Sequence, residues 1–227
     1  MGIFISGTDT ECGKTAVACA LINAASQSGL DVLGMKPIAS GSQRRDGVLE
    51  NEDVERILAA NGRAGAAPET EQWVNQFMFE PPIAPHIAAA QTGNAIDVEV
   101  IGEAYTRLAE RCEHVIVEGV GGWRIPLNEG DFLAELPRRL GLPVLLVVGV
   151  KLGCINHALL SASAIGDDGL ELRGWVANEI EPDTQVKDDI ITTLRTHIEA
   201  PMIARIGHNA CDASAFSERD LKWVLSS

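Results

Sequence analysis

Basic residues and aromatic residues are both scarce in this chain. Its 227 residues include 18 Lys and Arg against 32 Asp and Glu, which gives a formal net charge of −14, and only 4% are aromatic. A nucleic-acid-binding domain usually carries a stripe of basic residues, and no such stripe is visible. The longest apolar run, residues 144–150, is far too short to cross a bilayer. We therefore expect neither nucleic acid nor a membrane as a partner.

Closely spaced cysteine pairs are also missing. The cysteines stand at positions 12, 19, 112, 154 and 211, an odd number with no Cys-x-x-Cys spacing. A disulfide framework or a structural zinc site is therefore not expected. No basic segment followed by an apolar stretch opens the sequence, so we predict no secretory signal and expect a cytoplasmic protein.

Short apolar segments alternate with amphipathic segments along the chain. We expect strands at residues 3–5, 32–35, 115–117, 143–148, 172–177 and 202–206, and helices at residues 14–28, 98–111, 132–140, 155–165 and 184–198. Strands without in–out alternation are typical of a parallel sheet that is buried on both faces. The sequence therefore predicts one doubly wound α/β domain over residues 1–227, with helices on both faces of a mainly parallel sheet. Residues 40–85 are less regular, and we expect a helical excursion with loops there.

A phosphate-binding loop is predicted between the first strand and the first helix. The segment Gly7-Thr8-Asp9-Thr10-Glu11-Cys12-Gly13-Lys14-Thr15 follows an apolar strand and opens a helix, which is the context of a P-loop. Five residues separate its two glycines, one more than in the standard motif. In such a loop Lys14 reaches the β- and γ-phosphates and the Thr15 hydroxyl binds Mg²⁺. A glycine-rich turn with a surface lysine is the alternative, and it explains less of the pattern.

A second acid is expected where a later strand ends beside this loop. Glu118 closes the predicted strand at residues 115–117, and Gly119, Gly121 and Gly122 follow it. Ligands of open α/β sheets bind at the carboxyl ends of strands, where a carboxylate can hold Mg²⁺. Glycines there favour close approach of the backbone to a ligand. On this pattern alone, the alternative is a strand-end glutamate that faces solvent.

Several segments together resemble the dethiobiotin synthetase family, in the order in which that family carries them. They are residues 7–15 (GTDTxxGKT), 36–41 (KPxxSG), 51–53 (NxD), 85–86 (PH), 117–123 (VEGxGG and Trp), 147–157 and 174–178. The resemblance implies an ATP- and Mg²⁺-dependent ring closure. One amine of 7,8-diaminopelargonic acid takes up CO₂ as a carbamate, ATP phosphorylates the carbamate, and the second amine closes the ureido ring of dethiobiotin. The resemblance also implies a homodimer with the substrate site at its interface.

Individual roles follow from the same resemblance. Lys14 and Lys36 are the expected catalytic residues, because two cations would offset the repulsion between carbamate and γ-phosphate. Thr15, Asp53 and Glu118 would hold Mg²⁺. The nucleotide would contact Glu11, Cys12, Gly13, Lys14, Thr15, Ala16, Glu118, Gly119, Val120, Gly121, Asn178, Gly207, His208 and Asn209. The substrate would contact Thr10, Lys36 and Ser40, and its distal carboxylate would meet a helix start on the second subunit at Gly153, Cys154, Ile155 and Asn156.

Two positions depart from the family pattern. Cys12 stands in the phosphate loop where relatives often carry Val, and Gly207 stands where they often carry Pro. We expect Cys12 to be a quiet small side chain, although thiol oxidation there would affect the loop.

Three other functions fit the sequence less well. A switch ATPase of the partition and cell-division positioning type carries a signature lysine five residues before the Gly-Lys-Thr lysine, where this chain has Asp9. The related cobyrinate amidotransferases need a glutaminase domain, for which we expect no room. A pseudo-enzyme that only binds nucleotide would not need to keep Lys36, Asp53 and Glu118.

Overall fold

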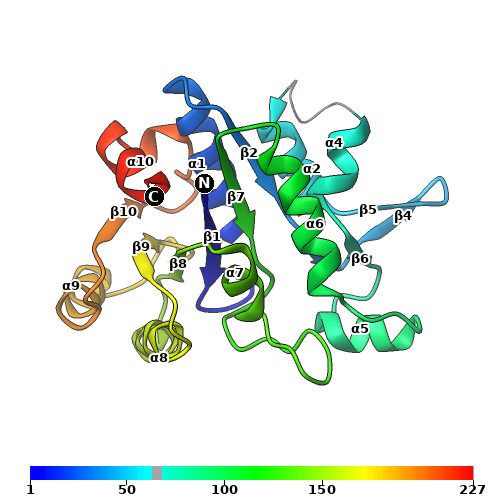
Figure 1. Ribbon diagram of the computed structural model, residues 1–227. Coiled ribbons are helices and arrows are strands. Elements are labelled where there is room, and N and C mark those ends of the chain that lie inside the picture. The colour runs from blue at the N-terminus through cyan, green and yellow to red at the C-terminus, as the bar shows by residue number, and fades with distance from the viewer. Residues whose placement is uncertain (63–67, 227) are drawn as a thin grey trace.

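A six-stranded parallel sheet organises the chain, and the computed structural model describes residues 1–62 and 68–226 (Figure 1). The strand order is β10–β9–β8–β1–β7–β2, with every neighbouring pair parallel. The strands are β1 (Gly2–Gly7), β2 (Val32–Met35), β7 (His114–Glu118), β8 (Val144–Gly149), β9 (Leu172–Asn178) and β10 (Met202–Ile206). They coincide with the six predicted segments, so the prediction of a parallel sheet is confirmed.

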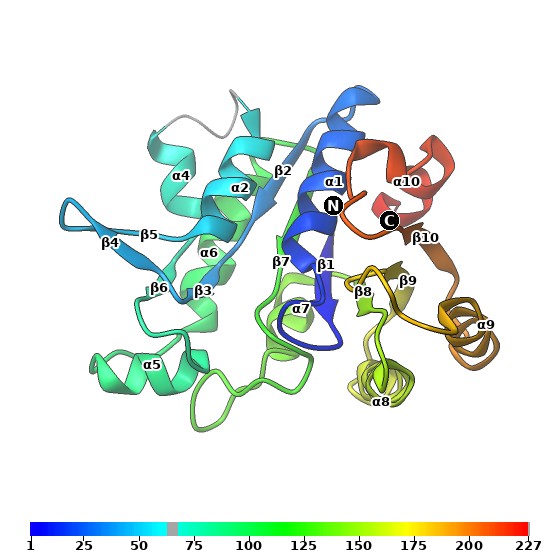
Figure 2. The same cartoon turned by 180° about the vertical axis from the view of Figure 1, so that it is seen from behind.

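Helices cover both faces of this sheet (Figures 1 and 2). Helices α6 (Val98–Ala109), α7 (Glu135–Leu140), α8 (Cys154–Asp167) and α9 (Lys187–His197) share one apolar cluster with the sheet. The opposite cluster contains α1 (Lys14–Gln27), α2 (Glu52–Ala60) and α10 (Glu218–Leu225), together with the short 3₁₀ helix η1 (Ala213–Ala215). Helices α7 and α9 begin three residues later than predicted, because Phe132 pairs with Pro126 in a β-bridge and Val186 has a left-handed φ of 52°.

Successive residues of the strands are buried on opposite faces. In β1, Phe4 belongs to the cluster with α6 to α9, whereas Ile3 and Ile5 belong to the cluster with α1. In β8, Leu146 and Leu145 divide in the same way. A strand in this position has no solvated face, which explains why the sequence shows no alternation of apolar and polar residues.

The segment between β2 and α6 is more than the helical excursion that the sequence predicts. Besides α2, α4 (Pro68–Val74) and α5 (Pro85–Gln91), it contains two small sheets. Strands β3 (Ile38–Ser40) and β6 (Phe77–Phe79) pair in parallel, and β4 (Gln43–Arg45) and β5 (Val48–Glu50) form a hairpin whose turn residues Asp46 and Gly47 are left-handed. Strands of three residues are too short to show a periodic pattern. Residues 63–67 of this segment lie outside the described residues.

A buried asparagine joins α2 to the edge of the central sheet. The side chain of Asn61 accepts a hydrogen bond from Gly34 N at 2.6 Å and donates one to Gly34 O at 2.9 Å. The two bonds satisfy the backbone N–H and C=O of Gly34. Gly34 lies on the edge strand β2, where these groups would otherwise need other partners. They also hold α2, which carries Asp53, against the strand that leads to Lys36.

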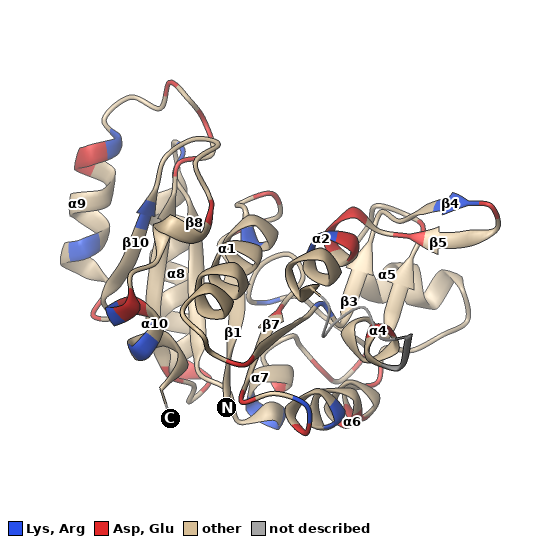
Figure 3. Cartoon of the chain, turned by 90° about the horizontal axis from the view of Figure 1, so that it is seen from above, with Lys and Arg blue, Asp and Glu red and all other residues tan. Residues whose placement is uncertain are grey.

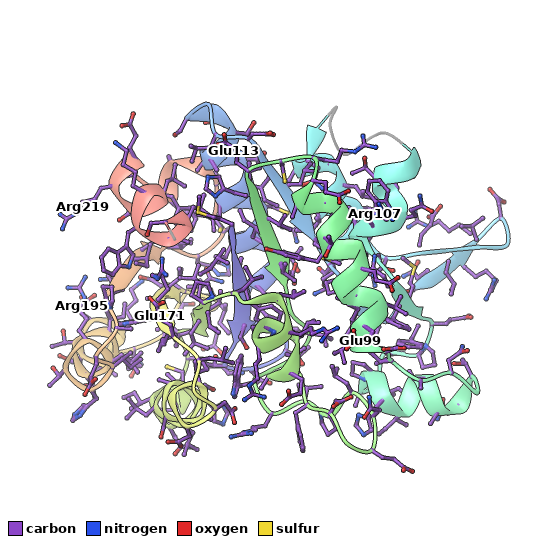
Figure 4. The ribbon with its side chains drawn as sticks, viewed as in Figure 1. Glu99, Arg107, Glu113, Glu171, Arg195 and Arg219 are labelled. Carbon is purple, nitrogen blue, oxygen red and sulfur yellow. The ribbon has the colours of Figure 1, made fainter. Side chains whose placement is uncertain are left out.

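Charged residues are scattered over the helices and loops, and the strands of the central sheet are mostly uncharged (Figure 3). Side chains such as Arg195 on α9 and Arg219 on α10 point away from the sheet (Figure 4). Within the described part of the chain, no helix combines the length and the apolar character needed to span a membrane.

Candidate functional site

A cavity of about 560 Å³ opens at the carboxyl ends of β1, β2 and β7. Such crevices are where open α/β sheets bind their ligands. The predicted site residues that line it are Thr10, Glu11, Gly13, Lys14, Thr15, Ala16, Lys36, Ser40, Asp53, Glu118, Val120 and Gly121. Segments that are far apart in the sequence therefore meet around one space, as the motif pattern predicts.

Two glycines determine the shape of the phosphate loop. A Cβ added to Gly7 would lie 2.4 Å from the sulfur of Cys12, and one added to Gly13 would lie 2.1 Å from Nδ2 of Asn178. Gly13 also has a φ of 92°, a conformation that L side chains rarely adopt. Glu11 is left-handed as well, with a φ of 61°. The loop is thus folded tightly around positions where no side chain fits.

Lys14 is the first residue of α1, directly after the phosphate loop, and is 7% exposed. Its Nζ donates a hydrogen bond to the backbone oxygen of Asp9 at 2.9 Å. The Asp9 carboxylate in turn accepts from Thr10 N at 2.8 Å and lies 3.3 Å from Lys151 Nζ. Partial burial opposes ionisation of Asp9, but these two bonds keep its pKa below the ordinary value. The loop therefore holds one ammonium group inside itself and keeps its own acid ionised.

Glu118 connects the phosphate loop to the end of β2. Its side chain is fully buried, and Oε1 accepts from Thr15 Oγ1 at 2.7 Å and from Lys36 Nζ at 2.6 Å. Lys36 is 3% exposed, donates to Gly119 O at 3.1 Å, and lies 3.5 Å from the carboxylate of Asp53. A buried charge needs such partners, because desolvation otherwise outweighs the gain from burial. The carboxylate of Glu118 thus holds the predicted metal ligand Thr15 and the predicted catalytic residue Lys36 in one place.

The oxygen ligands suit a magnesium ion that also binds phosphates. Oε2 of Glu118 is buried and has no hydrogen-bond partner among the described residues. Thr15 and Asp53 add a hydroxyl and a second carboxylate to the same cavity. In the described ranges, no group of three or more His, Cys, Asp or Glu side chains is arranged so that it could hold a metal ion. Mg²⁺ does not require one, because it commonly takes one or two carboxylates together with substrate phosphates and water.

Ser40 also lines the cavity and has a free hydroxyl. Its Oγ is buried without a partner among the described side chains and backbone. Asn51 sets this geometry, because its Nδ2 donates to Ser40 O at 3.3 Å while its Oδ1 caps α2 by accepting from Asp53 N at 3.1 Å. The predicted substrate residue and the predicted metal ligand are therefore positioned by one buried amide.

Other predicted nucleotide residues support the loop or lie outside the cavity. Asn178 donates from Nδ2 to Cys12 O at 2.9 Å, so its amide anchors the phosphate loop. Cys12 is buried, and Gly119 is packed so closely against Phe4 that an added Cβ would lie 2.9 Å from the ring. The segment at residues 207–209 follows β10 and does not line the cavity.

The predicted carboxylate site at the start of α8 also lies apart from this cavity. Gly153 is the N-cap with a φ of 89°, and no side chain caps the helix. Cys154 is buried, and burial raises the pKa of its thiol, which agrees with a packing role rather than a nucleophilic one. Gly153 and Asn156 are exposed, so the helix start is accessible from outside the chain.

One charged residue that lines the cavity is not among the site residues predicted from the sequence. Arg56 lines the cavity from α2. In the sequence, the acidic residues around it indicate a helix face that is exposed to solvent. The available signal was its position three residues after Asp53, which places both side chains on one side of the helix.

Replacing Gly13 with alanine is expected to weaken ADP binding by about tenfold or more, the equivalent of one lost hydrogen bond to a charged group. The new Cβ would displace the Asn178 amide and shift the phosphate loop. Gly29→Ala is the matched control, because Gly29 has a similar φ of 80° but open space around it. The control is expected to lose about 1 kcal/mol of stability with unchanged ADP affinity. Equal ADP affinity in both variants, measured by calorimetry, would contradict this account of the loop.

Comparison with solved structures shows the same fold in several other proteins. The MinD cell division protein of Aquifex aeolicus matches with a TM-score of 0.58 and 15% identity over 98% of this chain and 94% of that one. A ParA family ATPase from Chlorobium tepidum TLS matches with a TM-score of 0.52 and 14% identity, covering 99% and 90%. The Signal Recognition Particle 54 kDa protein from Aeropyrum pernix K1, solved in complex with GDP, matches with a TM-score of 0.54 and 16% identity, covering 99% of this chain and 46% of that one. At these identities the likeness is one of fold.

A match to a protein-family model can show the family of the chain, because it compares the sequence itself. The model of an AAA domain, AAA_26, matches residues 1–211 and so includes the phosphate loop, Lys36, Asp53, Glu118 and Asn178. Together with the parallel sheet and the loop geometry, this match shows a P-loop NTPase-type domain that binds nucleotide. The chain belongs to the AAA domain family.

Proposed function

We propose that this protein is a dethiobiotin synthetase, which carboxylates 7,8-diaminopelargonic acid and closes its ureido ring at the expense of ATP. The observation that carries the proposal is Lys36, a second buried cation in the cavity of the phosphate loop. An enzyme that only hydrolyses ATP needs a single phosphate-binding loop with its lysine. A second buried lysine, in the same cavity as the free hydroxyl of Ser40, suits a second anion next to the γ-phosphate, as a carbamate would be. The dethiobiotin synthetases, whose motifs the chain resembles, also belong to AAA_26.

The proposed reaction has three steps. One amine nitrogen of the diamine bonds to the carbon of CO₂ and loses a proton, which leaves a carbamate. A carbamate oxygen then attacks the γ-phosphorus of ATP, and the bond from that phosphorus to ADP breaks. Finally the second amine attacks the carbamate carbon and loses a proton, the bond from that carbon to the phosphate oxygen breaks, and phosphate leaves with its electron pair. The protein supplies position and charge rather than a covalent intermediate.

Residues of the chain have distinct parts in this scheme. Lys14 would stabilise the phosphates, and Lys36 would neutralise charge between the carbamate and the γ-phosphate. Mg²⁺, held by Thr15, Asp53 and Glu118, would neutralise phosphate charge and align the transfer when bound. Thr10 and Ser40 would orient the amine end of the substrate. Asn178, besides holding the loop, lies on the side proposed for the adenine, together with Gly207, His208 and Asn209.

A homodimer would complete the substrate site. The helix start at residues 153–156 is exposed and presents backbone N–H groups, which suit the distal carboxylate of a substrate bound to the other subunit. Leu152 beside it is 92% exposed, and Leu160 on the same helix is 62% exposed. Exposed apolar side chains around such a helix start favour a contact with a second copy. All cysteines are free, in keeping with a cytoplasmic enzyme.

The alternative is a switch ATPase, because MinD and a ParA family ATPase share the fold. The signature position of that class is Asp9 here, and Asp9 pairs with Lys151 of its own chain. An acid held in this way cannot reach across to the phosphates of another subunit as a lysine would. The pairing therefore favours the synthetase over the switch.

The test is a reconstitution with the purified protein. Incubation with 7,8-diaminopelargonic acid, bicarbonate, Mg²⁺ and ATP is expected to yield dethiobiotin, detected by mass spectrometry, and omission of any component is expected to abolish it. ATP hydrolysis that is unaffected by the diamine and gives no dethiobiotin would contradict the proposal and favour the switch ATPase.

A further inference from the structure

Three cations line the cavity, and two of them are already bound to protein acceptors. Lys14 donates to Asp9 O, and Lys36 bonds to Glu118. The third is Arg56, which is exposed at the side of the cavity. Within residues 1–62 and 68–226, no hydrogen bond or ion pair engages its guanidinium group. Its guanidinium is therefore available to a ligand in the cavity.

The guanidinium of Arg56 lies near α1 and near the segment that follows β10. Burial raises the pKa of Cys19 on α1 to about 11 and that of Cys211, which follows β10, to about 11 as well. In both thiols the positive charge of Arg56 opposes that rise, so the guanidinium is near both. Helix α1 packs against η1, the short helix that follows Cys211. Arg56 therefore lies where α2 packs against α1, near the segment that follows β10.

We propose that Arg56 binds the phosphate chain of the nucleotide at the phosphates that ATP and ADP share. This inference rests on the proposed nucleotide site. A planar guanidinium offers paired N–H donors that match phosphate oxygens, which a lysine cannot do. Arg56 lies near α1, the helix that begins directly after the phosphate loop and lines the cavity with Ala16, so its guanidinium is placed for the phosphates next to the start of that helix. In the proposed function, Lys36 and Ser40 are assigned to the carbamate beside the γ-phosphate. Two lysines that are held by protein oxygens leave part of the phosphate charge for Arg56 to neutralise.

Calorimetric titration with Mg²⁺–ADP tests this assignment without requiring turnover. Arg56→Ala is expected to raise the Kd for ADP about tenfold. Arg56→Lys is expected to give a smaller increase in Kd, because the positive charge remains but the paired N–H donors of the guanidinium are lost. In Arg56→Ala, the Kd for a non-hydrolysable ATP analogue is expected to rise by the same factor as the Kd for ADP. Arg195→Ala is the matched control, since Arg195 is an exposed arginine on α9 outside the cavity (Figure 4). Its Kd is expected to equal that of the unmodified protein.

The outcomes separate this inference from the proposed function. An unchanged Kd for ADP in Arg56→Ala would overturn the role of Arg56 while leaving the synthetase proposal intact. Weakening confined to the ATP analogue would also overturn it, because it would place Arg56 at the γ-phosphate. If the unmodified protein binds ADP but forms no dethiobiotin, the synthetase proposal fails, and a weaker Arg56→Ala still supports the inference. Absence of ADP binding by the unmodified protein would overturn both.

Discussion

Replacing Lys36 with alanine is expected to lower the rate of dethiobiotin formation by about 100-fold or more, the usual cost of removing one preorganised group that stabilises transition-state charge. Lys36 lies 2.6 Å from Glu118 and lines the same cavity as Ser40, where the carbamate is proposed to bind. The Kd for ADP is expected to change little, because the phosphate loop is not altered. Steady-state product formation and calorimetry with ADP would measure the two effects separately.

The same substitution also affects folding, and the two effects need to be distinguished. Loss of Lys36 leaves the fully buried carboxylate of Glu118 without its cation, which is expected to cost about 3 kcal/mol of stability or more. The control is the double variant Lys36→Met with Glu118→Gln, which keeps the volume and removes both charges. We expect the double variant to regain stability but not activity. A folded Lys36→Met protein with near-normal turnover would remove Lys36 from the mechanism.

Replacing Lys14 with alanine is expected to raise the Kd for ADP by about 100-fold and to suppress turnover, because the loop loses its charged contact with the phosphates. The stability of the free protein is expected to be unchanged or slightly higher. Lys14 is a buried cation whose oxygen partner is the neutral carbonyl of Asp9, so its removal relieves a desolvation cost. ADP should therefore raise the melting temperature of the unmodified protein but not that of the variant.

Lys187→Ala provides the comparison for Lys14. Lys187 also forms a single close contact, at 2.6 Å to Glu179, but it lies on α9 outside the cavity. Its removal changes the net charge of the protein by the same amount. We expect Lys187→Ala to bind ADP like the unmodified protein. If both variants weaken ADP binding equally, the effect would come from net charge rather than from the phosphate loop.

Prediction from sequence worked well where a pattern repeats along the chain. The strands of the central sheet are each buried on both faces, so each leaves a continuous apolar run that is easy to recognise. The phosphate loop was equally visible, because glycine is the only residue that fits at Gly7 and Gly13. Prediction failed for β3 to β6. Strands β3 and β6 depend on pairing with a distant segment, and β4 and β5 form a hairpin whose three-residue strands are too short to show a periodic pattern.

Contacts between distant segments explain what the sequence could not reveal about the site. Asn178 bonds to a residue 166 positions away, so its role in holding the loop has no local signal. The amide of Asn51 caps the start of α2, which is a local interaction, but its bond to Ser40 O has no such signal in the sequence. Arg56 was hidden for a different reason. A charged residue on an acidic helix face looks solvated until the fold turns that face toward a cavity.

The sequence by itself determined the parallel α/β sheet, the phosphate loop and the set of residue types that phosphate and metal chemistry require. These features depend on local preference, burial pattern and close spacing, all of which can be read along the chain. Only the tertiary structure decided that Glu118 joins Thr15 to Lys36, that Ser40 keeps a free hydroxyl, and that the guanidinium of Arg56 remains available. The reason is physical: a buried polar group takes whichever partner the packing of distant segments brings within reach, and a single chain segment does not encode that choice.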